Sequence, residues 1–407
     1  MKGLRAYGNK DYATALREFK PFAEEGDIEA QYYLGLMYRN GEGVNQDYQT
    51  AVKWLRLAAE QGHAEAQTHL YTIHTVGSLG VPQDHQTAVK WLRLAAEQGH
   101  ELAQINLGSM YYRGDRVIQD HKTAVKWYRL AAERGNRHAQ STLGFMYYKG
   151  EGVIQDNQTA VKWFRLAAEQ GNYEAQNSLG LMYARGRGVS KNDTTAVIWF
   201  TLAAERGHAG AQSNLGFMYR KGEGVIQDHK TAVKWFRLAA EQGRADSSSN
   251  IGGSLTTEQG LAAAQLNLGE MYALGHGVPQ DHQTAFKWIR LAAEQGLANA
   301  QSNLGVAYSK GEGINQDFQT AVKWIGLAAE QGFALAQLNL GNMYRKGEGV
   351  PQNHVYAHMW FNLAASQGHE EVAEVRDLVA KAMSPSQIER AQDLAHECLK
   401  KKYKGCD

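Results

Sequence analysis

Histidine can bind metal ions and exchange protons near neutral pH, and this chain contains 15 histidines. Eight recur at two positions of a repeated segment, after a glycine or after an aspartate: His63, His100, His208, His369, His85, His121, His229 and His282. Equivalent positions in neighbouring helical repeats lie about 10 Å apart, too far to share an ion. His354 and His358 have the i, i+4 spacing of a metal-binding pair, but His358 falls at an apolar core position and no third ligand is evident. We therefore predict no metal site and no cofactor.

Sequence signatures of common catalytic sites are also missing. The chain contains no HExxH zinc-protease motif, no GxSxG nucleophile turn, no serine-lysine signature and no obvious pair of carboxylates. Its Gly-Glu-Gly segments follow no predicted strand and lack the lysine and hydroxyl of a phosphate-binding loop. We predict that the protein is not an enzyme, although a hydrolase site assembled from distant residues stays open because no motif would reveal it.

Two cysteines near the C-terminus could form a disulfide. Cys398 and Cys406 flank the end of the last predicted helix, and Gly405 could let the tail fold back. A bond would indicate an oxidising compartment, whereas two free thiols are equally compatible with the sequence.

Composition limits the classes of ligand and the location. The 43 Lys and Arg balance 42 Asp and Glu, so the net charge of +1 provides no field that would attract nucleic acid. No stretch approaches the roughly 20 apolar residues of a membrane span, which predicts no membrane insertion, and no signal peptide opens the chain. Because residues 2–9 resemble the tail of a helix, an upstream segment could have been removed; export to the periplasm and a cytoplasmic location both stay open.

The elements that carry all these residues are tandem repeats. The nine tryptophans share one register, separated by 36 or 37 residues except for one interval of 53: Trp54, Trp91, Trp127, Trp163, Trp199, Trp235, Trp288, Trp324 and Trp360. Around each tryptophan the sequence approximates AQxxLGxMYxxGxGVxQDxxTAVKWxRLAAEQG. Its apolar spacing predicts two helices per repeat, and stacking must bury the broad apolar surface of the second helix.

Local signals define these helices in the first copy. A first helix is predicted over residues 27–38, with Gly35 at a close approach to the second helix. Gly41 and Gly43 supply a turn that tolerates positive φ, Asp47 caps the second helix, and Gly62 follows the end of that helix.

The predicted organisation follows from the repeat boundaries. Residues 1–29 form N-terminal capping helices, 30–246 repeats one to six, 247–263 an insertion, 264–371 repeats seven to nine, and 372–407 a C-terminal helical cap. The insertion has the Ser- and Gly-rich composition of a mobile linker. A hinge and a simple surface loop are both compatible with it.

These motifs, above all the AQxxLGxMYxxGxGVxQD block and the AAEQG ending, closely resemble the Sel-one-like repeat family, a relative of tetratricopeptide repeats. The resemblance covers residues 30–367. It implies an all-α, right-handed superhelical α-solenoid of about nine 36-residue helix-turn-helix repeats. It also implies an adaptor in protein assemblies, which in bacterial members is often exported and linked to envelope processes or host contact.

If the first helices line the concave face, as the resemblance implies, two sets of residues could bind a protein or peptide partner. The residue before each Leu-Gly forms the first set: Tyr33, His69, Asn106, Thr142, Ser178, Asn214, Asn267, Asn303 and Asn339. Residues after the tyrosine of the first helix form the second set: Arg39, Tyr112, Tyr148, Arg185, Arg220, Arg345 and Lys346. The asparagines could instead tie the first helix to an adjacent loop of the stack.

We therefore predict a non-enzymatic scaffold for protein–protein interactions. A binder or inhibitor of cell-wall glycan is the alternative, and an unrecognised hydrolase comes third. The sequence does not define the oligomeric state.

Overall fold

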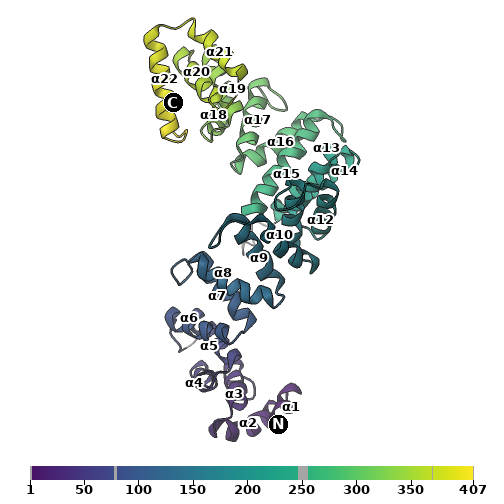
Figure 1. Ribbon diagram of the computed structural model, residues 1–407, viewed down its shortest axis with the longest axis vertical. Helices are drawn as coiled ribbons and strands as arrows, with labels where there is room; N and C mark the ends of the chain where they lie inside the picture. Colours follow the sequence, from purple (N-terminus) through teal and green to yellow (C-terminus); the bar gives the residue numbers. More distant parts are fainter. Residues whose placement is uncertain (1, 78–79, 246–254, 369, 407) are drawn as a thin grey trace. The chain divides into compact units, whose positions relative to one another are not determined.

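A computed structural model describes residues 2–77, 80–245, 255–368 and 370–406, and these residues form 22 α-helices and no β-sheet (Figure 1). The helices are α1 Lys2–Gly8, α2 Tyr12–Glu24, α3 Ile28–Asn40, α4 Tyr48–Glu60, α5 Ala64–Val76, α6 His85–Glu97, α7 Glu101–Arg113, α8 His121–Glu133, α9 Arg137–Lys149, α10 Asn157–Glu169, α11 Tyr173–Arg185, α12 Asp193–Glu205, α13 Ala209–Lys221, α14 His229–Ala245, α15 Leu255–Leu274, α16 His282–Glu294, α17 Ala298–Lys310, α18 Phe318–Ala329, α19 Ala334–Lys346, α20 His354–Ala365, α21 Glu370–Ala380 and α22 Pro385–Lys400. Within each unit most consecutive helices pack against one another, so the predicted all-α solenoid is confirmed.

The chain divides into two compact units, Met1–Lys191 and Asn192–Asp407. The first unit contains α1–α11 and the second contains α12–α22. Within each unit, the first helix of a repeat packs on its own second helix and on the second helix of the preceding repeat, as α3 packs on α4 and on α2. The division falls inside the fifth repeat and not at the predicted insertion.

Side-chain caps set where the helices begin. Asp27 accepts a hydrogen bond from the amide of Ala30 at 2.8 Å and starts α3. Asp47 accepts from the amides of Gln49 and Thr50 and from the Thr50 hydroxyl, which starts α4. These hydrogen bonds, the one from the Thr50 hydroxyl first, hold the pKa of Asp47 below its ordinary value. The predicted N-cap of the second helix is therefore confirmed.

Two glycines in the turn of the first repeat take the left-handed conformation that the sequence predicted, and in the third repeat Arg116 takes it at the second position with φ of +61°. Gly41 closes α3 with φ of +74° and Gly43 follows with φ of +71°. A Cβ at Gly43 would lie 2.9 Å from the carbonyl oxygen of Tyr12, at the start of the preceding second helix. The turn therefore rests directly on the neighbouring repeat.

The glycine inside the first helix brings the two helices of a repeat together. A Cβ on Gly35 would lie 2.7 Å from Cγ of Leu55, a distance that real side chains do not adopt. The same clash would arise between Gly144 and Phe164 and between Gly341 and Phe361. The predicted close approach is confirmed, and its cost to helix propensity is offset by the buried contact of the two helices.

The predicted N-terminal cap has the packing of a repeat. A Cβ on Gly3 of α1 would lie 2.7 Å from Phe19 of α2, which reproduces the contact between Gly35 and Leu55. Phe19, Leu34 and Met37 are buried in one cluster that joins α2 to α3. Helices α1 and α2 thus continue the stack of the first unit.

The predicted insertion at 247–263 is helical in its second half. Residues 247–254 lie outside the described residues, but residues 255–263 form the first turns of α15. A Cβ on Gly260 would lie 3.0 Å from Cα of Gly210 in α13, so the backbones approach closely at this point. The Ser- and Gly-rich residues of the insertion all lie in 247–254, whereas residues 255–263 contain Gly260 as their one glycine, at the point of this close approach.

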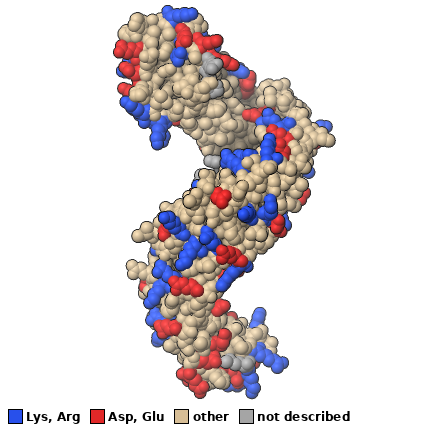
Figure 2. All heavy atoms as spheres, viewed as in Figure 1, with Lys and Arg blue, Asp and Glu red and all other residues tan. Residues whose placement is uncertain are grey.

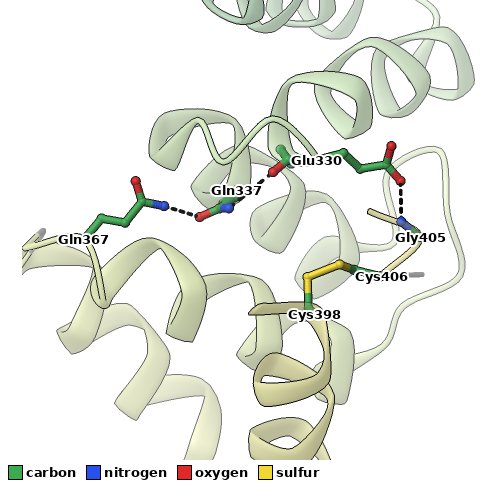
Figure 3. The surroundings of a disulfide bond; sticks show 7 residues. Glu330, Gln337, Gln367, Cys398, Gly405 and Cys406 are labelled. Carbon is green, nitrogen blue, oxygen red and sulfur yellow. Dashed lines mark hydrogen bonds between the residues drawn. A yellow bond between two sulfur atoms is a disulfide. The ribbon is translucent and has the colours of Figure 1, made fainter. Parts of the chain in front are cut away.

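The C-terminal helices cover the end of the second unit. Cys398 of α22 and Cys406 of the tail form a disulfide (Figure 3). Both residues are buried with Trp360 and Leu363 of α20 in one cluster. The amide of Gly405 donates to Oε1 of Glu330 at 3.2 Å. The tail therefore folds back on the segment that follows α18.

Candidate interaction surface on the first helices

Buried glutamines fix the first helix of each repeat in its place. Gln31 is 4% exposed, and its Nε2 donates to the carbonyl oxygen of Ala23, 3.1 Å away, in the preceding second helix. Its Oε1 accepts from Nε2 of Gln61 at 2.9 Å, at the end of its own second helix. The same glutamine pair recurs as Gln67–Gln98, Gln140–Gln170, Gln212–Gln242, Gln265–Gln295, Gln301–Gln331 and Gln337–Gln367, the last of which is drawn in Figure 3.

These glutamine pairs assign a structural role to two recurring motifs of the sequence. The glutamine of Ala-Gln and the glutamine of Glu-Gln-Gly are the two partners, 30 or 31 residues apart. In the third repeat Arg134 replaces the second partner and donates to the carbonyl of Gly99. Oε1 of Gln104 then has no hydrogen-bond partner among the described residues.

The residues before each Leu-Gly lie at one register on the first helices. All nine are half-buried, whereas the leucine that follows each of them is buried. Tyr33 stacks on Phe19 with ring centroids 5.3 Å apart, so in the first repeat this position belongs to the packing of α2 on α3. His69 contacts Arg39 and the Tyr32 hydroxyl of the preceding first helix.

The asparagines at this register differ in their partners. Nδ2 of Asn267 donates to the carbonyl oxygen of Ala263 in its own helix at 2.8 Å. Nδ2 of Asn303 lies 3.5 Å from Oε1 of Glu270 in the neighbouring first helix. Among the described residues, the side chains of Asn106 and Asn339 form no hydrogen bond, so their amides can serve an external partner.

One charged cluster joins three first helices of the second unit. Nη1 of Arg220 in α13 donates to Oε2 of Glu270 in α15 at 2.9 Å, and Asn303 of α17 approaches the other carboxylate oxygen. The side chains of Arg220 and Glu270 are 21% and 34% exposed, so solvent reaches the pair. The structure thus brings two of the predicted binding residues, Arg220 and Asn303, together at the carboxylate of Glu270.

Sequence reasoning missed Glu270. A signal was nevertheless present, because the residue after the Leu-Gly pair is uncharged in the other repeats, for example Leu36, Ser109, Phe217 and Val306. An acidic residue at a position that is otherwise uncharged indicates a local role. We define the Arg220 cluster as Arg220, Glu270 and Asn303.

Several residues of the second predicted set link neighbouring repeats. The hydroxyl of Tyr112 donates to Oε2 of Glu151 at 2.8 Å, in the turn of the next repeat. The hydroxyl of Tyr148 instead accepts a hydrogen bond from Nη1 of Arg187, in the turn of the next repeat. Arg345 donates to Asn342 of its own helix at 3.3 Å, whereas Arg185 and Lys346 are exposed. Stacking contacts therefore use part of the donor capacity of this set.

Burial and neighbouring charges shift the pKa values of the polar residues on this surface. Burial, together with the Arg39 guanidinium, lowers the pKa of His69 to about 4, so its imidazole is neutral at physiological pH. Burial and the hydrogen bond to Glu151 raise the pKa of Tyr112 to about 12. Both side chains are therefore uncharged hydrogen-bonding groups.

The described residues contain no group of three or more His, Cys, Asp or Glu side chains placed to hold a metal ion. His358 is 3% exposed and lies in the core, and burial lowers its pKa. No helix in the described ranges is long and apolar enough to cross a membrane.

The chain is similar to known repeat proteins over nearly its whole length. The Sel1 repeat profile matches nine segments: residues 28–63, 72–100, 102–136, 137–172, 174–208, 209–243, 262–297, 298–333 and 334–369. No curated protein is significantly similar to the chain.

Two solved structures support the same assignment. A protective antigen of uropathogenic Escherichia coli strains, which displays an SLR fold, is 35% identical with a TM-score of 0.61; the match covers 99% of this chain and 91% of the antigen. A Sel1 repeat protein from Oxalobacter formigenes is 34% identical with a TM-score of 0.58, covering 80% of this chain and 89% of that protein. With nine matched repeats and relatives of this identity, the chain belongs to the Sel1 repeat family.

Proposed function

We propose that this protein is a non-enzymatic scaffold that binds an extended or helical segment of a partner protein on the face formed by its first helices. Sel1-repeat proteins generally act as protein-interaction scaffolds, and their fold is typically non-catalytic. The observation that carries the proposal is the Arg220 cluster, in which Arg220, Glu270 and Asn303 present charged and amide groups from three helices.

The chemistry of this face suits a peptide. The half-buried asparagine amides can donate to and accept from the backbone of an extended segment, a recognised mode of peptide binding. Partial burial on the scaffold restrains these side chains before binding, which lowers the entropy lost in the complex. The cluster can also exchange part of its internal ion pair for contacts with a charged partner group.

Location in the envelope or at a host contact is the finer part of the proposal. A disulfide such as Cys398–Cys406 persists in oxidising compartments, which supports export. The similarity to a protective antigen of uropathogenic Escherichia coli supports the same location.

Affinity capture tests the binding face. A tagged protein is incubated with extract of the cells that produce it, beside a variant with Asn267, Asn303 and Asn339 changed to Ala. The control changes Thr194, Gln283 and Gln319, exposed residues at the starts of α12, α16 and α18, to Ala. We expect quantitative mass spectrometry to find a partner that the first variant loses and the control retains. Capture of no protein, with sedimentation of the scaffold on wall polymer, would contradict the proposal and favour glycan binding.

A further inference from the structure

The C-terminal loop of the chain gathers positive charge. Residues 397–406 contain four lysines against one carboxylate, that of Glu397. All four lysine side chains are exposed, and none of them forms an ion pair within the described part of the chain. Figure 2 shows Lys and Arg side chains grouped at the end of α22, in the same view as Figure 1. We call the four residues the tail lysines: Lys400, Lys401, Lys402 and Lys404.

Other residues of the same loop hold it on the second unit. Cys398 and Cys406, which form the disulfide, are 1% and 7% exposed. A Cβ on Gly332, in the turn after α18, would lie 2.9 Å from Cε2 of Tyr403, so this ring rests on the turn. The anchoring side chains are therefore turned towards the protein, whereas the tail lysines between them face solvent.

Lys402 occupies a position that favours glycine. The amide of Lys402 donates to the carbonyl oxygen of Leu399, and the amide of Tyr403 donates to that of Cys398, which closes α22. In this two-bond motif the first residue beyond the helix cap takes a positive φ and is usually glycine. Lys402 has φ of +54°, and Tyr403 follows with φ of +67°. Two consecutive residues with a side chain are therefore held in the left-handed conformation.

The repeats close their second helices with the same motif but use glycine. At the end of α4, Gly62 has φ of +95° and donates to the carbonyl oxygen of Ala59. Glycines with positive φ follow the other second helices in the same way: Gly99, Gly135, Gly171, Gly207, Gly296, Gly332 and Gly368.

A structural role does not account for Lys402. A lysine inside the last helical turn, such as Lys400, already interacts favourably with the helix C-terminus. The last turns of α4, α8 and α18 contain no basic residue, so ending a second helix in this chain does not require one. Because a lysine at positive φ costs stability that glycine would not, its presence in an exposed loop indicates a role in binding.

The composition of the loop selects the class of anion. Nucleic-acid binding favours arginine, whose planar guanidinium binds phosphate with two hydrogen bonds, but residues 397–406 contain no arginine. The one aromatic ring of the loop, that of Tyr403, rests on Gly332 and is not free to stack on a base. Leu399, directly before the tail lysines, is 43% exposed. Lysines beside an exposed apolar side chain fit the interface of an anionic lipid bilayer.

We propose that the tail lysines dock this protein on an anionic lipid bilayer as a peripheral contact. One lysine close to such a surface strengthens binding about fivefold, so four correspond to a factor on the order of 10²–10³. Because the disulfide and Tyr403 hold the loop in place, binding costs less conformational entropy than it would for a free tail. This site lies on the tail and is independent of the proposed function of the first helices.

Vesicle sedimentation tests the docking. The full chain, with its disulfide intact, is incubated at low ionic strength with vesicles of phosphatidylcholine, either alone or mixed with phosphatidylglycerol. We expect at least tenfold stronger partitioning onto the vesicles that contain phosphatidylglycerol, and release at about 1 M salt, where the screening length falls to about 3 Å. Equal partitioning onto both kinds of vesicle, or none onto either, would overturn the proposal.

Substitutions of Lys402 separate docking from folding. Lys402→Gly should weaken partitioning about fivefold, because one charge is lost, and should raise the urea midpoint of unfolding, because glycine tolerates the positive φ. Lys402→Arg keeps the charge and should partition as the wild type does. A Lys402→Gly protein that partitions as strongly as the wild type would contradict the proposal.

A charge-matched pair of variants locates the site. Changing Lys401 and Lys404 to Gln should weaken partitioning about 30-fold. Changing Lys90 and Lys162 on the second helices of the first unit to Gln removes the same charge and should leave partitioning unchanged. All four side chains are exposed, so both variants should retain the wild-type circular dichroism spectrum. Equal losses would indicate attraction by total charge and would overturn the site. Stronger binding of an oligothymidylate than of the anionic vesicles, compared per phosphate, would overturn it in favour of single-stranded nucleic acid.

Discussion

The carboxylate of Glu270 in α15 accepts a hydrogen bond from Nη1 of Arg220 in α13 at 2.9 Å. These residues belong to successive first helices, and Asn303 of the following first helix approaches the same carboxylate. The ion pair is partly exposed, so its contribution to stability is about 0–1 kcal/mol. Its position on the proposed binding face predicts a larger role in recognition than in folding.

Changing Glu270 to Gln should therefore weaken partner capture at least fivefold while lowering the free energy of unfolding by no more than about 1 kcal/mol. Glu294→Gln is the matched control, because Glu294 forms an ion pair of the same length with Arg290 on the outer surface of α16. Capture is measured by quantitative mass spectrometry and stability by urea unfolding. Equal losses of capture in the two variants would remove the Arg220 cluster from the binding site.

Two glycines in contacting repeat helices should respond in opposite ways to alanine. A Cβ on Gly305 of α17 would lie 3.0 Å from the carbonyl oxygen of Ala321 and 3.1 Å from the amide nitrogen of Ile325, both backbone atoms of α18. We expect Gly305→Ala to lower the free energy of unfolding by about 1–3 kcal/mol, because the two helices must separate.

Gly326 of α18 provides the control for this prediction. No atom lies within 4 Å of a Cβ built there. Gly326→Ala should raise stability by about 0.5–1 kcal/mol through helix propensity and the smaller entropy of the unfolded chain. Urea unfolding followed by circular dichroism measures both variants. A neutral Gly305→Ala would show that the two helices are not packed as closely as described.

The glutamine pairing predicts a stabilising substitution. Arg134→Gln places a side-chain amide at the position where Gln61, Gln98 and Gln170 each donate to a buried glutamine. The new amide should donate to the unpaired Oε1 of Gln104 and raise the free energy of unfolding by about 1 kcal/mol. The reverse change, Gln98→Arg, should lower stability by a similar amount because Oε1 of Gln67 loses its donor. Thermal unfolding of both variants checks the pair. Two shifts of the same sign would contradict the role assigned to these glutamines.

Acid should destabilise the first unit through His69. Its pKa is about 4 in the folded protein and about 6.5 when unfolded, so the unfolded chain binds the proton more tightly. Stability is therefore full above pH 6.5 and falls as the pH drops towards 4. We expect a loss of about 1–2 kcal/mol, less than the full linkage value because His69 is partly exposed.

His69→Asn introduces the residue found at this position in five other repeats and should remove that part of the acid sensitivity. Burial lowers the pKa of His74 and His358 as well, so some sensitivity should remain. The measurement is urea unfolding at several pH values, with the exposed His282 changed to Asn as the control. Identical pH profiles of wild type and His69→Asn would contradict the assigned shift.

Features that depend on residues close together in the sequence were predictable. The cap at Asp47, the turn glycines and the contact of Gly35 with the second helix follow from local propensities that recur in most repeats, whereas the cap at Asp27 was not predicted. The glutamine pairs were not predicted, since each joins residues about 30 positions apart, although both partners recur in the motif. Glu270 occurs once, and only the packing of α13, α15 and α17 shows what it contacts. The approach of Gly260 to Gly210 was not predicted, because it joins residues 50 positions apart and no repeated motif marks it.

Site-specific photo-crosslinking tests the central claim most directly. A benzoylphenylalanine replaces Val306, which lies on α17 one turn beyond Asn303, or Ile198, which is 55% exposed on the second helix α12 of the same unit. After illumination of the producing cells, the account predicts one protein partner crosslinked through position 306, absent at position 198 and lost when Glu270 is also changed to Gln. Crosslinks of equal yield from both positions, or from position 198 alone, would contradict binding on the first helices.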